Sequence, residues 1–303
     1  MSAGVRVGVD VGGSTTVAVA LAADGAVVAR DERTTIRGTA GVIAGIIAAI
    51  DAVALRDEIS SIGVGVPGRV SGGSVHDAVN LGIVEVDLAG PVSEHFSSSA
   101  VRVENDVRAA TRGIGIQCGS GSLAYLNLGT GVAAGVLVDG RVNDGSRGVA
   151  GEIGHLSIDP SGPRCACGQR GCIEAFAGGG SIAVRTGGGP FAVREVFDRA
   201  DHGDPIAREI VSGLARGAAA AVRTLALAVD PDTIVIGGGI ARLGARLMGP
   251  ILTELATSAA SSAFLSSLRL AERIELLPQG IPIGAIGAAL SDARIATVAV
   301  GTG

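Results

Sequence analysis

The chain has 303 residues, of which 47% are hydrophobic and only 2% aromatic, so it can form two domains whose cores consist of small aliphatic side chains. Its net charge is −5, it has no dense basic run, and all 24 of its basic residues are arginine. This composition argues against a protein that binds nucleic acids or membrane surfaces, and it excludes a P-loop lysine or a Schiff-base lysine. Any phosphate must be bound by backbone N–H groups, hydroxyls, arginine or a metal ion.

The sequence contains no uninterrupted apolar run of about 18 residues, the length needed to cross a membrane as a helix. Residues 42–50 and 218–229 are shorter or interrupted by Arg223, and they predict buried helices. No basic region precedes an apolar stretch at the N-terminus, so a secretory signal is not expected. Four cysteines, three of them clustered, favour metal binding in a reducing compartment over disulfides. We therefore expect a cytoplasmic protein without a membrane partner.

Two similar hairpins are predicted along the chain. Residues 5–11 form a β-branched run that ends in Gly12-Gly13-Ser14-Thr15, and a second strand is expected at residues 17–22. The pattern returns at residues 123–138, where the turn is Gly129-Thr130-Gly131. Two hairpins whose turns carry glycine and a hydroxyl suggest a duplicated α/β domain. A chance match remains open in a chain with 49 glycines.

Helical apolar spacing follows each hairpin, at residues 40–55 and 208–229. After the second helix, residues 233–236 predict a buried strand that ends in Gly237-Gly238-Gly239. No stretch has the composition of a flexible linker. The class is therefore α/β.

We place the domain boundary in the Gly- and Ser-rich residues 113–122. This gives an N-terminal α/β domain of residues 1–115 and a C-terminal α/β domain of residues 116–283. A last apolar helix, within about residues 284–303, is expected to pack back onto the first domain.

A cluster of cysteines predicts a metal site. Cys165, Cys167 and Cys172 offer three thiolates within eight residues, and His155 lies ten residues before the first of them. One histidine and three cysteines complete a tetrahedral shell for Zn²⁺. The alternative is three buried cysteines beside an unrelated histidine. Because the shell has no vacant position, the zinc ion would be structural and would not activate water.

The two glycine turns are candidate phosphate sites. Asp10 ends the first strand, and the following turn combines glycines, which allow close backbone approach, with two hydroxyls. This suits the terminal phosphates of a nucleotide and Mg²⁺ without a lysine. Such a turn is weak evidence by itself, but two of them facing each other would clamp a triphosphate. Gly237 to Gly239 could lie along a nucleotide or could simply form a tight turn.

Glu104-Asn105-Asp106 follows a predicted strand at residues 101–103 and precedes a predicted helix. Phosphoryl transfer to an alcohol needs a carboxylate that accepts the hydroxyl proton, and amides or acids that hold the sugar. Asp106 suits the first task and Asn105 the second. The same residues could instead cap the helix.

Together these motifs resemble the ROK family, whose best-known members are bacterial glucokinases. The resemblance covers nearly the whole chain. Its most specific part is Gly151-Glu152-Ile153-Gly154-His155 followed by the Cys-x-Cys-Gly-x-x-Gly-Cys segment of residues 165–172 and by Glu174. The other matching segments are residues 10–15, 65–68, 104–106, 128–131 and 236–239.

The resemblance implies a two-domain fold of the actin-like, hexokinase-like kind, which is a duplicated ribonuclease H-like fold with an interdomain cleft. It implies an ATP-dependent kinase that phosphorylates a hexose hydroxyl, giving a sugar 6-phosphate by default. The cofactors would be Mg²⁺ and a structural Zn²⁺, and the assembly a homodimer or homotetramer.

The resemblance also assigns roles to residues. Asp106 would be the catalytic base, and His155 would bind zinc through one nitrogen while the other faces the sugar. The implied sugar ligands are Asn80, Asn105, Asp106, Glu152, His155 and Glu174. The implied phosphate and Mg²⁺ residues are Asp10, Gly12, Gly13, Ser14, Thr15, Gly129, Thr130 and Gly131, with Gly237 and Gly238 along the nucleotide.

Departures from the family pattern flank the implied sugar ligands. Val79 replaces the usual proline before Asn80, and residues 81–84 lack the tryptophan common in glucokinases. Residues 175–180 read Ala-Phe-Ala-Gly-Gly-Gly where Tyr-Ala-Ser-Gly is frequent, and Ser14 replaces a threonine. The sugar therefore stays open among glucose, N-acetylmannosamine, N-acetylglucosamine, mannose, allose and fructose.

Other activities also have to be considered. The chain could be a non-catalytic sugar-sensing member of the family or a transcriptional regulator. Regulators carry a winged-helix module before the first phosphate loop, whereas only nine residues precede Asp10 here. Polyphosphate as phosphoryl donor would call for a basic track, which the sequence lacks. We expect a kinase that does not bind nucleic acid.

Overall fold

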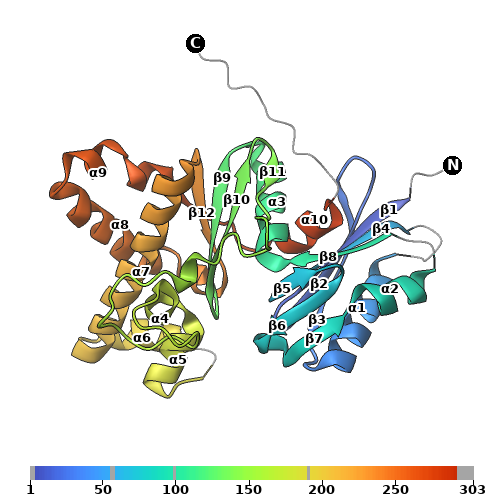
Figure 1. Ribbon diagram of the computed structural model, residues 1–303, viewed down its shortest axis with the longest axis horizontal. Coiled ribbons are helices and arrows are strands. Elements are labelled where there is room, and N and C mark those ends of the chain that lie inside the picture. Colours follow the sequence, from blue (N-terminus) through green and yellow to red (C-terminus); the bar gives the residue numbers. More distant parts are fainter. Residues whose placement is uncertain (1–3, 55–58, 98–99, 190–191, 292–303) are drawn as a thin grey trace, which may run out of the picture. The chain divides into compact units, whose positions relative to one another are not determined.

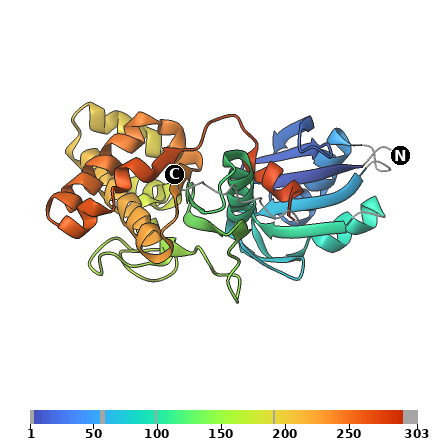
Figure 2. The same ribbon diagram turned by 90° about the horizontal axis from the view of Figure 1, so that it is seen from above.

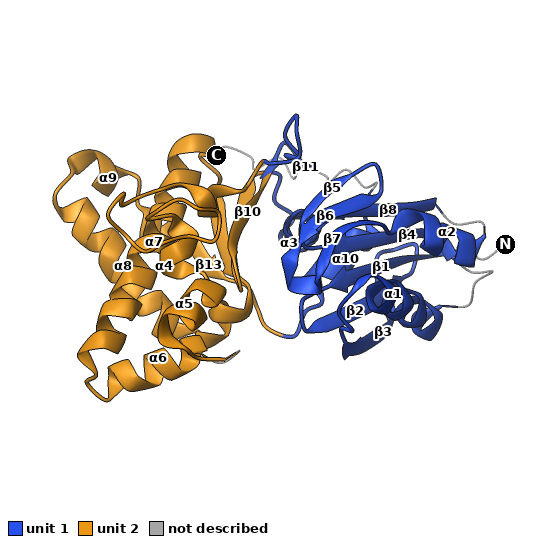
Figure 3. Ribbon diagram, turned by 60° about the horizontal axis from the view of Figure 1, so that its bottom comes forward, with its two compact units in different colours: residues 1–121, 137–149, 280–303 blue, residues 122–136, 150–279 orange. Residues whose placement is uncertain are grey.

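The computed structural model describes residues 4–54, 59–97, 100–189 and 192–291. The chain divides into two compact units, which Figure 3 shows in blue and orange. Unit 1 comprises residues 1–121, 137–149 and 280–303, and unit 2 comprises residues 122–136 and 150–279. Residues 116–121, 137–149 and 280–283, which the sequence analysis assigned to the C-terminal domain, therefore belong to unit 1.

Unit 1 contains a five-stranded sheet in the order β3-β2-β1-β4-β8 (Figure 1). Its strands are β1 (Val5–Val11), β2 (Thr15–Leu21), β3 (Val27–Thr34), β4 (Ile59–Val66) and β8 (Ala100–Asn105). Strand β2 runs antiparallel to both β1 and β3, whereas β4 runs parallel to β1 and β8 parallel to β4. The polypeptide therefore ends β1, β4 and β8 at the same edge of the sheet.

Helices and a small sheet complete unit 1. The helices are α1 (Thr39–Val53), α2 (Ala89–Phe96), α3 (Asp106–Cys118) and α10 (Ile283–Ala289). The small antiparallel sheet has the order β5-β6-β7, with strands Arg69–Ser71, Ser74–Ala78 and Ile83–Asp87, and the short helix η2 (Val79–Leu81) joins the last two.

A second five-stranded sheet has the order β11-β10-β9-β12-β13. Its strands are β9 (Leu123–Leu128), β10 (Val132–Val138), β11 (Arg141–Val142), β12 (Thr233–Gly237) and β13 (Ile274–Leu276). In both sheets the first strand, β1 or β9, has a hairpin on one side and two parallel strands on the other. The two strand orders therefore correspond one to one. The predicted duplication of an α/β domain is confirmed.

The remaining elements of unit 2 are mostly helical. They are η3 (Ile153–His155), α4 (Ile173–Ala177), α5 (Gly179–Thr186), α6 (Ala192–Asp201), α7 (Pro205–Val229), η4 (Gly239–Leu243), α8 (Ala245–Ala260), α9 (Ala263–Ser267) and η5 (Leu270–Arg273). The apolar helix α7 is long enough to cross a membrane by length and composition alone, but 61% of its most apolar window is buried. It forms part of the main core of unit 2, as the sequence predicts for a buried helix.

The two faces of the unit 1 sheet are packed differently. Side chains alternate between the faces along a strand, so the valines of β1 point to one side and Gly8 and Asp10 to the other. Val7, Val9 and Val11 are fully buried in a core shared with α1, and Val5 is partly buried against it. On the opposite face, a Cβ atom on Gly8 would lie 1.9 Å from the carbonyl oxygen of Ala285 in α10. The backbone of α10 therefore rests directly on the backbone of the sheet.

Glycines make this close approach possible throughout. A Cβ on Gly63 of β4 would lie 1.8 Å from the carbonyl oxygen of Ala288, and one on Gly287 would lie 1.7 Å from that of Ala109 in α3. Figures 1 and 2 both show the red α10 beside the blue strands, although these segments are far apart in the sequence. The helix expected within about residues 284–303 is thus α10 of unit 1, while residues 292–303 lie outside the described residues.

We predict that Gly63→Ala lowers the free energy of unfolding by about 2 kcal/mol or more, because the new methyl group overlaps the backbone of α10. Gly45→Ala is the matched control, since a Cβ at this position of α1 meets no atom within 4 Å and alanine favours a helix by about 1 kcal/mol. Thermal and denaturant unfolding of both variants measure the difference. Equal stability of the two would contradict the packing described here.

Candidate active site and metal centre

The parallel strands of unit 1 bring the predicted acidic residues together. Asp10 at the end of β1 pairs with Gly65 of β4, which in turn pairs with Glu104 of β8. Asn105 and Asp106 follow directly at the same edge of the sheet. A Cβ on Gly65 would lie 3.2 Å from the Cβ of Ala109, so a glycine there allows α3 to pack close to the sheet.

The carboxyl of Asp10 is electrostatically unusual. Its side chain is half-buried, and α10 packs closely against it, because a Cβ on Gly284 would lie 2.4 Å from its Oδ2. Burial and, as a smaller contribution, the negative charge of Asp106 together raise the pKa of Asp10 to about 7. Two carboxyls that repel each other at a glycine-lined strand end are the oxygen donors that a hard cation such as Mg²⁺ prefers. The residues present therefore fit a magnesium ion.

Asn105 and Asp106 take different parts at the start of α3. Asn105 is the N-cap, because its Oδ1 accepts hydrogen bonds from the N–H groups of Val107 at 3.0 Å and Arg108 at 3.3 Å. Its Nδ2 donates to the carbonyl oxygen of Gly68 at 3.2 Å. The capping alternative therefore holds for Asn105. Asp106 is the first residue of the helix, and its Oδ1 also accepts a hydrogen bond from the N–H of Val107, at 2.9 Å.

Glu104, the first residue of the same motif, has a structural partner. Its Oε1 accepts a hydrogen bond from Arg112 of α3 at 2.5 Å, and both side chains are largely buried. Burial raises the pKa of Glu104, although the charge of Arg112 opposes this shift. The pair holds β8 against α3 and thereby fixes where the helix begins.

Arg108, also on α3, binds the segment that precedes Gly151. Its Nη2 donates to the carbonyl oxygens of Asp144 at 3.1 Å and Gly148 at 2.7 Å. The Arg108 side chain is almost fully buried. These bonds attach residues 144–148 to α3 within unit 1.

The first glycine turn is tight and well anchored. The N–H of Gly12 donates to the carbonyl oxygen of Thr15 at 2.9 Å, which closes the turn. Ser14 and Thr15 are exposed, and a Cβ on Gly13 would lie 3.3 Å from the Cβ of Asn80. The structure therefore places Asn80, on η2, beside the turn, together with Asp10.

The second glycine turn, in unit 2, is held by the first turn of α5. The N–H groups of Gly179 and Gly180 donate to the carbonyl oxygens of Gly129 at 2.9 Å and Thr130 at 2.8 Å. In a trans peptide the N–H of the next residue points the opposite way, so the N–H groups of Thr130 and Gly131 point away from α5. The turn thus offers donors that suit an anion.

Glu174 of α4 is tied to the same turn. Its Oε2 accepts a hydrogen bond from the N–H of Val132 at 2.9 Å, and a Cβ on Gly131 would lie 2.6 Å from this oxygen. A glycine at position 131 is therefore required for the carboxylate to sit there.

Gly237 and Gly238 end β12 next to the end of β9. A Cβ on Gly237 would lie 2.6 Å from the ring of Tyr125, and one on Gly238 would lie 2.4 Å from the carbonyl oxygen of Leu128. Gly238 also has a positive φ of 88°. Packing alone thus accounts for both glycines, whether or not a nucleotide lies along them.

The Gly-Glu-x-Gly-His motif packs on β10 through its two glycines. Cβ atoms on Gly151 and Gly154 would lie 1.8 Å and 2.0 Å from carbonyl oxygens of that strand. This close contact leaves Glu152 exposed and places His155 half-buried at the end of η3. The spacing of the motif therefore fixes the two functional side chains relative to the sheet.

His155, Cys165, Cys167 and Cys172 converge as predicted. Their ligand atoms all lie within 4.8 Å of one another. His155 Nδ1 is 3.8 Å from Cys165 Sγ, and the sulfurs of Cys167 and Cys172 are 3.7 Å apart. Zinc–sulfur bonds of about 2.3 Å in a tetrahedron put sulfurs about 3.8 Å apart. The four residues therefore fit a zinc ion.

The chemistry of the thiols agrees with this geometry. Burial, followed by the neighbouring thiols, raises the pKa of Cys172 to about 12, and burial raises that of Cys165. Hydrogen bonds from Gln169 lower the pKa of Cys167 to about 6. The pKa values of the three neighbouring thiols are thus shifted in opposite directions. A bound divalent cation would stabilise all three as thiolates.

Comparisons with known proteins agree with these features. The model of the ROK family matches residues 6–290. The chain belongs to the ROK family. A glucokinase of Halalkalibacterium halodurans is 33% identical over 275 residues, which cover 81% of this chain and 83% of that protein. An N-acetylmannosamine kinase of Yersinia pseudotuberculosis is 30% identical over 240 residues, covering 76% and 81%.

A solved structure extends the likeness to three dimensions. A ROK glucokinase from Streptomyces griseus, in complex with glucose and AMPPNP, superposes with a TM-score of 0.73. It is 27% identical and covers 94% of this chain and 98% of its own. The expected actin-like, hexokinase-like fold of the ROK family is confirmed.

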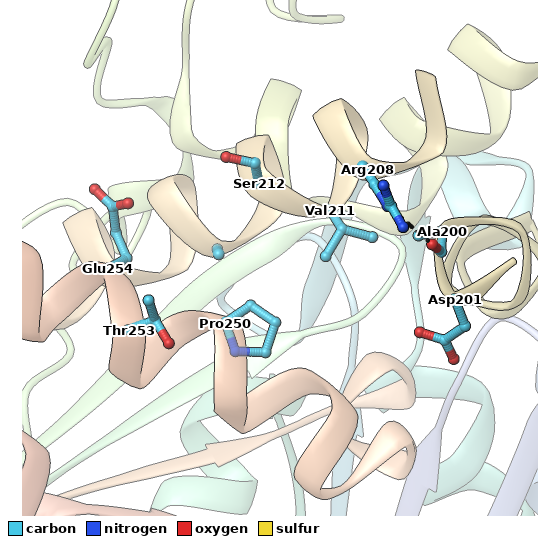
Figure 4. A pocket seen from close by; sticks show the side chains of 9 residues that line it. Ala200, Asp201, Arg208, Val211, Ser212, Pro250, Thr253 and Glu254 are labelled. Atoms are coloured by element: carbon cyan, nitrogen blue, oxygen red, sulfur yellow. Dashed lines mark hydrogen bonds between the residues drawn. The ribbon is translucent and has the colours of Figure 1, made fainter. Parts of the chain in front are cut away.

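A hollow of about 410 Å³ lies elsewhere on this ROK protein, between α6, α7 and α8 of unit 2 (Figure 4). Figure 4 shows Asp201, Arg208 and Glu254 around it. The residues that line it include none of those to which the sequence analysis gave a role. We assign this hollow no part in catalysis.

Sequence reasoning missed three contacts around the first half of the site. The Glu104–Arg112 pair, the bonds of Arg108 to residues 144–148, and Thr35 beside the first turn had no signal that spacing could reveal. Glu104 lies in strand β8 and Arg112 eight residues later in helix α3, so no periodic spacing relates them. Their pairing depends on the packing of α3 against β8.

We predict about one zinc ion per chain in the purified ROK protein, the stoichiometry of a closed four-ligand site. Cys167→Ser should lose the metal and reduce the midpoint of thermal unfolding by about 5 °C or more, because the loop of residues 155–172 loses its cross-link. Elemental analysis and calorimetry measure both effects. Cys118→Ser, outside the cluster, should keep full zinc and stability. A metal-free wild-type protein would contradict the assignment.

Proposed function

We propose that the protein is an ATP-dependent sugar kinase that transfers the γ-phosphoryl group of ATP to a hexose hydroxyl. One observation carries this proposal: the glycine turn of residues 12–15 and the carboxylates of Asp10 and Asp106 lie at one edge of the unit 1 sheet. Phosphoryl transfer needs a phosphate cradle, a cation and a proton acceptor close together. Relatives named glucokinase and N-acetylmannosamine kinase support the same reaction.

Asp106 is the proposed catalytic base. It accepts the proton of the sugar hydroxyl while that oxygen forms a bond to the γ-phosphorus, and the bond from the γ-phosphorus to the bridging oxygen of ADP breaks. The products are a sugar phosphate and ADP, with the proton on Asp106.

The phosphate groups are proposed to bind the two glycine turns, Gly12 to Thr15 in unit 1 and Gly129 to Gly131 in unit 2. Asp10 is proposed to hold Mg²⁺, whose charge would offset that of the phosphates. Gly237 and Gly238 are proposed to lie along the nucleotide. With no lysine in the chain, backbone N–H groups carry most of the phosphate binding.

Sugar binding is proposed to use residues of both units: Asn80, Asn105, Asp106, Glu152, His155 and Glu174. His155 directs Nδ1 to the metal cluster, which leaves Nε2 for a sugar hydroxyl. Asn105 has one amide hydrogen left after its bond to Gly68. A structural zinc ion is proposed to hold the loop that carries His155 and precedes Glu174.

Glucose and N-acetylmannosamine are the first two sugars to consider, since the relatives carry these names. Val79, which stands where the family usually has proline, and Val84, in the segment that lacks the tryptophan of glucokinases, are each 83% exposed. A coupled assay of ADP release with Mg-ATP across glucose, N-acetylmannosamine, N-acetylglucosamine, mannose, allose and fructose identifies the substrate. ADP release with none of them would favour a non-catalytic sugar-sensing member of the family.

We further propose a cytoplasmic homodimer or homotetramer that binds neither nucleic acid nor membranes. The support is the family resemblance and the acidic net charge of −5. Light scattering of the purified protein measures the assembly.

We predict that Asp106→Asn lowers turnover about 100-fold or more, because the amide keeps the shape of the side chain but accepts no proton. Sugar binding, measured by calorimetry, should be largely retained. Asp232→Asn, a change of the same kind at an exposed position of unit 2, should leave turnover unchanged. Near-wild-type turnover of Asp106→Asn would mean that another group accepts the proton.

A further inference from the structure

Thr35 follows β3 and lies against the first glycine turn, although no sequence motif includes it. Its Oγ1 donates a hydrogen bond to the carbonyl oxygen of Gly12 at 2.8 Å, and its N–H donates to the carbonyl oxygen of Ser14 at 3.0 Å. The residue is 9% exposed, although the turn that it contacts is open to solvent. One threonine therefore binds two of the carbonyl groups of the turn.

The hydrogen bonds form a chain with a defined direction. Thr35 has one hydroxyl proton, which goes to the carbonyl oxygen of Gly12, because a carbonyl cannot donate. Thr16 Oγ1 lies 2.9 Å from Thr35 Oγ1, so Thr16 must be the donor of that bond. Thr16 is 2% exposed, so this bond is shielded from solvent. Two buried hydroxyls thus hold the Gly12 carbonyl.

This arrangement determines where the N–H groups of the turn point. In a trans peptide the C=O of one residue and the N–H of the next are antiparallel, and the described chain contains no cis peptide bond. Because the carbonyls of Gly12 and Ser14 point to Thr35, the N–H groups of Gly13 and Thr15 point away from it. The carbonyl oxygens of Gly12 and Ser14, which would repel phosphate, are thereby kept off the ligand side.

We propose that Thr35, supported by Thr16, is a positioning residue that presents the N–H groups of Gly13 and Thr15 to the terminal phosphates of the nucleotide. The inference rests on the proposed phosphate role of the first turn. The second turn achieves the same orientation with backbone donors of α5, so only the first turn depends on side-chain hydroxyls. A substitution of Thr35 can therefore test this positioning role.

The test compares Thr35→Val, Thr35→Ser and Thr34→Val. Thr35→Val removes the hydroxyl at nearly constant volume and should raise the KM for ATP about fivefold to tenfold, the effect of one lost hydrogen bond with a buried acceptor left unpaired. The KM for the sugar should stay unchanged. Thr35→Ser keeps the hydroxyl and should restore the KM for ATP. Thr34→Val, the same change one residue earlier at an exposed position of β3, is the matched control.

Binding measurements separate positioning from a general loss of stability. Thr35→Val should weaken the binding of ATP and of inorganic triphosphate by the same factor, while the binding of adenosine stays unchanged, because adenosine has no phosphate. An equal loss for all three ligands, or no loss for any of them, would overturn the inference.

Two further measurements cover a Thr35→Val variant that does not fold and an error in the proposed phosphate site itself. If Thr35→Val does not fold, the amide proton resonance of Gly13 in the wild-type protein should shift on addition of inorganic triphosphate, and an unchanged resonance would overturn the proposal. Asp10→Asn distinguishes an error in the role of Thr35 from an error in the proposed phosphate site. If it weakens ATP binding and Thr35→Val does not, only the role of Thr35 is wrong; if neither does, the first turn is not the phosphate site.

Discussion

The direct contact between the backbone of α10 and the backbone of the unit 1 sheet is the constraint on which the site depends. Glycines at positions 8 and 63 of the sheet and at position 287 of the helix leave no room for a Cβ atom. The same face of the sheet carries Asp10, and a Cβ on Gly284 would lie 2.4 Å from its Oδ2. The helix therefore encloses the carboxylate, and this enclosure accounts for the raised pKa of Asp10.

A second principle is shared by the two glycine turns. In each, carbonyl oxygens are bound by donors from elsewhere in the same unit: Thr35 in unit 1, and Gly179 and Gly180 in unit 2. Two carbonyl oxygens of each turn are therefore bound, and the N–H groups of the same peptides point away from these donors. A chain without lysine can bind a highly charged anion in this way, since the orientation of peptide dipoles replaces a side-chain cation.

Much of this architecture could be predicted from the sequence because it depends on local patterns. The paired hairpins predicted the duplication, and the spacing of His155, Cys165, Cys167 and Cys172 predicted a cluster that the structure brings together. The extent of unit 1 could not be predicted, since Arg108 attaches residues 144–148 through contacts between distant segments. The spacing also left open whether Asn105 caps α3, because only the geometry of its hydrogen bonds decides this.

The placement of α10 also affects the order in which the protein can fold during synthesis. Arg30 of β3 donates a hydrogen bond to the carbonyl oxygen of Gly280, a residue 250 positions later. All of unit 2 leaves the ribosome between these two segments, so the glycine-lined face of the first sheet stays uncovered while the second unit is made. Contacts of such high sequence separation slow folding. The domain that begins first is therefore completed last.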